Sequence, residues 1–168
     1  MKYKYTDLSD ENKEKRKAAI EYFILSNTLN DEFLKQFYPP YEPPYSLKTY
    51  WEGCAQVLCG RGVTSLKDKA EDLLFWWQDK NWPGFFTVEE FVKKNSHLFI
   101  PLIKVKISEA YGIKDIGWFK NLLELLLITD TCLTKGQKEK AKNVLEYLED
   151  DIWKDFESKY NDFLKEML

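Results

Sequence analysis

Histidine is nearly absent from this chain of 168 residues, and cysteine is scarce. A single histidine, His97, excludes multi-histidine metal sites and disfavours a Ser-His-Asp arrangement. The three cysteines, Cys54, Cys59 and Cys132, are odd in number and form no CxxC pair, so free thiols in a reducing cytoplasm are favoured over disulfides. We therefore expect no metal and no cofactor. A nucleophile built from His97 and Cys54 or Cys59 stays open, although His97 at a helix start is more typical of a cap or a solvated side chain.

Other absences exclude further classes of protein. Glycine and proline, at 7 and 6 residues, are too few for a turn-dense sandwich or barrel. The formal net charge of -3 lacks the basic excess that non-specific nucleic-acid binding requires. The most apolar run, residues 122–128, is too short to span a bilayer, and the N-terminus lacks the apolar core of a signal peptide. These features predict a cytoplasmic protein that binds neither nucleic acid nor membrane.

Apolar residues, in contrast, are plentiful and recur at helical spacing. They make up 44% of the chain, and aromatic residues 16%, which is enough to fill a packed core. The length predicts one domain over residues 1–168. No segment alternates with period two, so we predict an all-α fold in which antiparallel helix pairs stack as a short HEAT-like α-solenoid or a compact bundle. Helices are expected near residues 10–24, 31–37, 47–58, 65–77, 87–92, 97–105, 116–128 and 135–167.

Several local signals place these helices. Asp115 is expected to cap a central helix, Thr134 with Gln137 to cap the last one, and Thr87 with Glu90 to open a short one. In the helix that starts at Ser96 or His97, the residues expected to face the core are Leu98, Leu102, Ile103 and Val105.

The Pro/Tyr-rich segment 38–45 breaks the helical pattern. Its paired prolines favour an extended path. We interpret it as a strap packed across the helices, and the alternative is a peptide ligand using the PxxP at Pro40 and Pro43.

A tryptophan-rich turn follows the fourth expected helix. A Trp-Pro-Gly sequence, which begins at Trp82, stops the helix, and it is preceded by Trp77, Asp79 and Asn81. Tryptophan is enriched at binding hot spots, so these side chains are candidates for a recognition groove. The alternative, which we favour, is that Trp77 and Trp82 join two helices while Asp79 or Asn81 accepts from backbone amides.

This turn belongs to a longer pattern, a leucine-rich helix ending in Trp-Gln-Asp-x-Asn-Trp-Pro, a second helix, and an Asp-x-x-Trp start to a third. Over roughly residues 66–128 the pattern resembles an uncharacterised bacterial family, domain of unknown function 5071. The resemblance implies HEAT-like helical repeats and carries no activity. The chain departs from it at Gly84-Phe85-Phe86 and at Phe119. The matching residues are Leu74, Trp77, Gln78, Asp79, Asn81, Trp82, Pro83, Phe91, Pro101, Ile103, Asp115 and Trp118.

The last expected helix is acidic in its middle, at Glu146, Asp150 and Asp151 among others. Such a charge run is usually a solvated face, but an acidic stripe also suits a binder of a basic protein. We therefore expect a non-enzymatic protein-protein interaction module, in its sharper form an immunity-type protein that neutralises a basic toxin. The alternative is a small-molecule-binding protein or enzyme with an aromatic pocket between helices. The candidate binding residues are Trp77, Asp79, Asn81, Trp82, Trp118, Glu146, Asp150 and Asp151, with Tyr111 near the alternative pocket.

Overall fold

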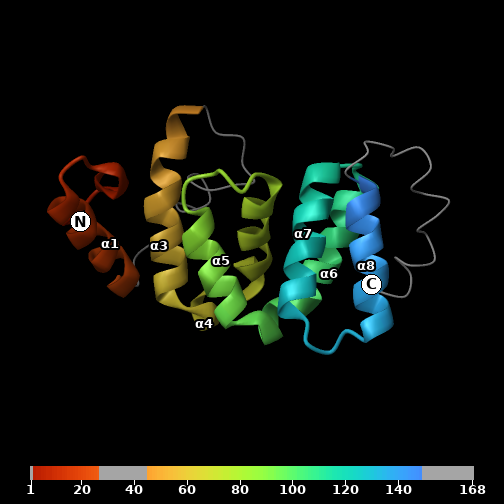
Figure 1. The fold of residues 1–168 in the computed structure, drawn as a ribbon. Helices are drawn as coiled ribbons and strands as arrows, with labels where there is room; N and C mark the ends of the chain where they lie inside the picture. The colour runs from red at the N-terminus through yellow and green to blue at the C-terminus, as the bar shows by residue number, and fades with distance from the viewer. Residues whose placement is uncertain (1, 27–44, 149–168) are drawn as a thin grey trace. The chain divides into compact units, whose positions relative to one another are not determined.

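The computed structural model describes residues 2–26 and 45–148 (Figure 1). Every regular element in these ranges is a helix, which confirms the all-α prediction. Three predicted segments lie wholly or partly outside the described residues. They are the helix expected at 31–37, the strap at 38–45 except its last residue, and the part of the last helix beyond Leu148. Within the described ranges, no helix combines the length and the apolar character needed to cross a membrane.

The chain divides into two compact units, residues 1–94 and 95–168. In the first unit α3 is central, and it packs against α1 on one side and α5 on the other. Its buried residues, Trp51, Cys54, Ala55, Val57 and Leu58, follow the three- and four-residue spacing seen in the sequence. The elements of this unit are η1 (Tyr5–Ser9), α1 (Lys13–Leu25), η2 (Tyr45–Tyr50), α3 (Trp51–Arg61), α4 (Val63–Leu66), η3 (Lys67–Gln78) and α5 (Phe85–Lys94), where η denotes a 3-10 helix.

The second unit contains α6 (Ser96–Gly112), α7 (Ile116–Thr129) and α8 (Lys135–Leu148), which lie side by side (Figure 1). The middle helix, α7, packs against both neighbours, and this explains why its apolar residues are spread around more than one face. Its central position was predicted from the sequence. The buried side chains of α7 include Trp118, Phe119, Leu122, Leu123, Leu125 and Leu126.

Two of the expected helix caps are present. The carboxylate of Asp115 accepts a hydrogen bond from the backbone N–H of Trp118 at 2.9 Å. At the start of α8, the backbone N–H of Gln137 donates to Thr134 Oγ1 at 3.2 Å, and the backbone N–H of Thr134 donates to Gln137 Oε1 at 2.9 Å. Both sets of bonds satisfy amides that the first helical turn leaves without a partner.

Several helices differ from the prediction in their start or their type. The first α-helix was expected to start near residue 10, but it begins at Lys13 with Asn12 as its cap, because residues 5–9 form a separate 3-10 helix. Residues 67–78 form a 3-10 helix where an α-helix was expected; apolar spacing of three and four residues does not distinguish the two. The capping box at Thr87 is also wrong, since α5 already begins at Phe85.

Candidate functional site

The tryptophan-rich turn is held together by its own hydrogen bonds. Asp79 Oδ1 accepts from the backbone N–H of Asn81 at 2.9 Å, and the Asp79 carbonyl accepts from the N–H of Trp82 at 3.0 Å. The indole N–H of Trp76 donates to the carbonyl of Pro83 at 2.9 Å. The polar side chain of Asp79 therefore stabilises the backbone between η3 and α5, in agreement with the structural interpretation of this motif.

The aromatic rings of the turn pack against neighbouring elements. Trp77 is 1% exposed, and its ring centroid lies 5.3 Å from that of Phe85 in an edge-to-face arrangement. Trp82 is half-buried and meets Trp51 of α3 edge-to-face at 4.9 Å. The ammonium of Lys48 lies 5.2 Å from the Trp51 ring centroid and 5.3 Å from that of Trp82. These contacts join the turn to α3 and leave the Trp82 ring as the partly accessible aromatic surface of the turn.

Trp118, the other aromatic candidate, is fully buried in the core of the second unit. Tyr111 is half-buried and its ring lies 6.1 Å from that of Phe119 in the same unit. Two clefts on the described surface are lined by other residues, mostly charged. The aromatic pocket of the alternative interpretation stays a prediction.

Glu146, the described member of the acidic set, is exposed on α8. It lines a cleft of about 630 Å³ together with Lys135, Lys138 and Lys142. The described part of α8 is therefore rich in lysine, and Glu146 stands at its C-terminal end. Asp150 and Asp151 lie outside the described residues.

The thiols are poorly placed for nucleophilic chemistry. Burial raises the pKa of both Cys54 and Cys59 to about 12, so very little thiolate forms on either at neutral pH. Cys132 and His97 are exposed, as expected for incidental surface positions. Among the described residues, no cluster of His, Cys, Asp and Glu has the arrangement needed to hold a metal ion.

Helix α6 carries a surface that the sequence interpretation missed. The predicted inward set was wrong for Leu98 and Val105, which are 45% and 56% exposed. The buried row of α6 is instead Phe99, Ile103, Ile107 and Ala110. Both rows have helical spacing. The row that contains Phe99 is buried because the apolar side chains of α7 pack against that side of α6.

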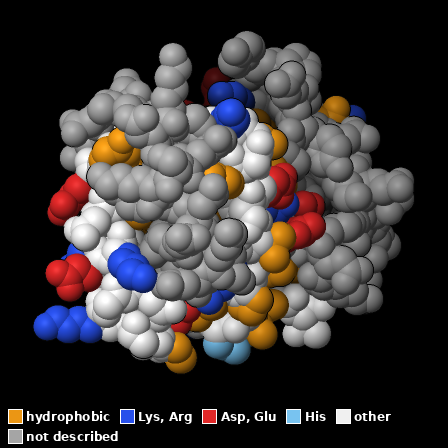
Figure 2. Space-filling model, turned by 90° about the vertical axis from the view of Figure 1, so that its right-hand side faces the viewer, with side chains coloured by type: hydrophobic (Ala, Val, Ile, Leu, Met, Phe, Trp, Pro, Cys, Tyr) orange, Lys and Arg blue, Asp and Glu red, His pale blue; other side chains and the backbone are white. Residues whose placement is uncertain are grey.

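We call Leu98, Pro101 and Val105 the outer row of α6. All three residues are exposed, and their spacing of three and four residues aligns them along the helix. Figure 2 shows hydrophobic side chains grouped beside the single histidine, His97, which precedes Leu98. A signal for this row was present in the sequence: α6 has apolar residues on two sides, whereas a helix at the surface normally has them on one.

A family model described as a domain of unknown function, DUF5071, matches residues 52–164. The chain belongs to this family. The match extends beyond the segment recognised from the sequence motifs and includes α3 through α8. No curated protein and no solved structure matches the chain. The structure explains the Asp-x-x-Trp motif of this chain. Asp115 caps the helix that carries Trp118.

Proposed function

We propose that this DUF5071 protein is a non-enzymatic protein-binding module and that the outer row of α6 is its contact surface. The observation that carries the proposal is the presence of apolar residues on both sides of α6. The inner row is filled by α7, so the outer row contributes nothing to the core of its unit. Its three residues leave apolar surface in contact with water, which a partner would remove.

The geometry of the row suits one mode of recognition. Apolar side chains at i, i+3 and i+7 are the anchors with which a helix occupies a hydrophobic groove of another protein. Polar side chains border the row, with Lys104 and Ser108 on one side and Glu109 on the other. An apolar centre with a polar rim is the usual anatomy of a protein-protein interface. The partner we propose is therefore a protein with an apolar groove.

The thiol environments support binding over catalysis. Cys54 and Cys59 were the candidate nucleophiles, and burial keeps both protonated at neutral pH. A cytoplasmic location agrees with three unpaired thiols, and we retain it as part of the proposal.

Two finer statements belong to the same proposal. The first is that the helix pairs stack as HEAT-like repeats; the packing of α7 between α6 and α8 supports it. The second is that the module is an immunity-type protein whose partner is a basic toxin, captured with the help of Glu146, Asp150 and Asp151. The acidic composition of the segment around these residues supports it, because complementary charge speeds association.

The test is affinity capture from a lysate of the native host with three tagged proteins: the parent, Val105→Glu and Leu25→Glu. Leu25 is 83% exposed on α1, so its variant makes the same kind of change on an exposed aliphatic residue outside the second unit. The proposal expects one stoichiometric partner that the parent and Leu25→Glu retain and Val105→Glu loses. A partner captured equally by all three would remove the outer row from the account. A partner lost only when salt is raised would assign binding to charge instead.

A further inference from the structure

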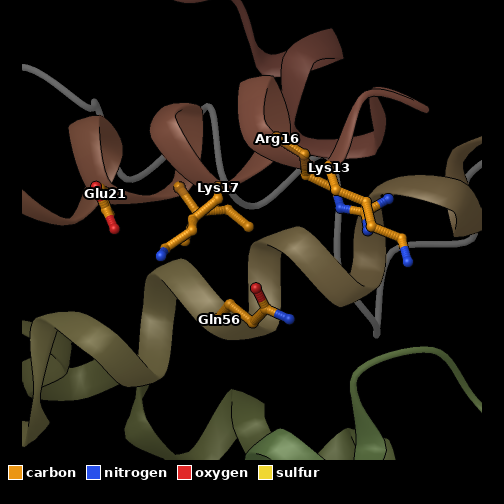
Figure 3. Close-up of a pocket in the computed structure, with 6 residues that line it drawn as sticks. Lys13, Arg16, Lys17, Glu21 and Gln56 are labelled. Carbon is orange, nitrogen blue, oxygen red and sulfur yellow. The ribbon is translucent and has the colours of Figure 1, made fainter.

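A cleft between α1 and α3 in the first unit is lined by three cationic side chains. It measures about 320 Å³, near the lower limit for small-molecule sites. Lys13, Arg16 and Lys17 come from α1, as do Ile20 and Glu21, while Gln56 comes from α3. Figure 3 shows Lys13 and Arg16 at one end of the cleft, Glu21 at the other, and Lys17 and Gln56 between them.

These cations are arranged at a cost to the helix. Lys13 and Lys17 are four residues apart and Arg16 is three from Lys13, so their like charges lie on one side of α1. Like-charged pairs at this spacing destabilise a helix. The packing of α1 does not require Lys13 and Lys17, which are exposed, because the buried contacts of the helix are made by Ala19 and Phe23.

Lys15, on the same helix, provides the contrast. Its ammonium lies 2.8 Å from Asp7 and 2.7 Å from Asp10, so two carboxylates neutralise it. Within residues 2–26 and 45–148, no carboxylate lies within ion-pair distance of Lys13 or Lys17. Arg16 uses one N–H on the carbonyl of Asp10 at 3.2 Å, which leaves most of its five donors for other acceptors.

We propose that this cleft binds a small phosphate ester, with the phosphate group at Lys13 and Arg16, whose charged groups lie at the same end of the cleft, and with Lys17 nearer to the organic part (Figure 3). Arginine and lysine together supply the charge and the directed donors that phosphate oxygens accept. The side chain of Ile20 offers an apolar wall to the organic part of the ligand. Glu21, an acceptor at the far end, would disfavour a second anionic group there and favour a hydroxyl or amine donor. Such a site is independent of the outer row of α6.

The first measurement is a pair of titrations, one with inorganic phosphate and one with glycerol 1-phosphate. Both are monitored by ¹⁵N-resolved NMR at constant ionic strength. We expect saturable shifts confined to the amides of residues 13–21 and the side-chain amide of Gln56. Glycerol 1-phosphate should bind more tightly than inorganic phosphate, because only the ester reaches Ile20 and Glu21. Acetate at equal concentration should cause smaller shifts, since it carries a smaller negative charge and has two oxygens where the phosphate group offers three.

The matched variants are Lys13→Gln with Lys17→Gln, and Lys15→Gln as the control on the same helix. The double variant should weaken phosphate binding by roughly tenfold or more, and Lys15→Gln by less than about threefold. Equal losses in the two proteins would show non-specific attraction and overturn the proposal, as would an absence of saturable shifts in the parent. Stronger shifts from a glutamate-rich peptide than from the phosphate ester would reassign the cleft to an acidic protein segment.

Discussion

Gly84 lies so close to Ala55 that a Cβ added to it would be 2.6 Å from the Cβ of Ala55. The same added atom would lie 3.0 Å from the carbonyl oxygen of Trp51 and 3.3 Å from the indole nitrogen of Trp76. Gly84 also has a φ of +87°, in the region that favours glycine. The Trp-Pro-Gly sequence therefore brings the backbone of the turn against α3, and only a residue without a side chain allows this approach.

Replacement of Gly84 by alanine should destabilise the first unit by about 2–4 kcal/mol, from backbone strain together with overpacking against α3. The measurement is the free energy of unfolding from urea titration followed by tryptophan fluorescence. Gly112→Ala is the matched control, because an added Cβ there meets nothing within 4 Å. A Gly84→Ala protein as stable as the parent would contradict the close approach of the turn to α3.

Removal of the Asp115 side chain tests the cap of α7. Asp115→Ala should cost about 0.5–2 kcal/mol, because the backbone N–H of Trp118 loses its acceptor. Asp115→Asn keeps an acceptor oxygen and should retain most of the stability. Equal losses in both variants, measured by thermal unfolding, would show that the charge of Asp115 matters and the cap does not.

The pH dependence of the first unit should include Asp7 and Asp10. Hydrogen bonds from the Lys15 ammonium, and then from the backbone N–H groups of Lys4 and Asn12 respectively, lower the pKa of both carboxyls below the ordinary value of 3.8. A carboxyl whose pKa is lower in the folded state stabilises the fold above its unfolded pKa, and this stabilisation is lost as the pH falls through the folded pKa.

Carboxyl titration by NMR should therefore give values below 3.8 for Asp7 and Asp10 in the parent protein. Lys15→Met should raise both values, whereas Lys13→Met should leave them nearly unchanged. If Lys13→Met raised them as much as Lys15→Met, the general field of α1 would be responsible and the direct bonds to Lys15 would not.

Thiol labelling should follow burial. Iodoacetamide at neutral pH is expected to modify the exposed Cys132 first, the half-buried Cys59 much more slowly, and the buried Cys54 only after unfolding, because burial raises the pKa of both Cys54 and Cys59 to about 12. Mass spectrometry of the digested protein measures the order. Fast labelling of Cys54 in the native protein would reopen the nucleophile hypothesis.

Helix periodicity and caps predicted the all-α fold, the central position of α7 and the caps at Asp115 and Thr134. They could not predict which side of α6 faces inward, because apolar residues of similar size occupy two helical rows and only α7 decides between them. The cationic cleft was equally hidden. The residues of its α1 wall are visible in the sequence, but the approach of Gln56 from α3 depends on packing between segments far apart in the chain. The Trp-rich turn was interpreted correctly in its hydrogen bonding because Asp79 and Asn81 act within a few residues of each other.

The affinity of a purified partner for Val105→Glu, measured by calorimetry beside the parent and Leu25→Glu, tests the central claim most directly. The account predicts that Val105→Glu binds the partner roughly tenfold or more weakly than the parent, since a charge would enter an apolar contact. The two variants, Val105→Glu and Leu25→Glu, should keep the thermal stability of the parent. Leu25→Glu should bind within about twofold of the parent. Unchanged affinity of Val105→Glu would show that the outer row of α6 is not the contact surface.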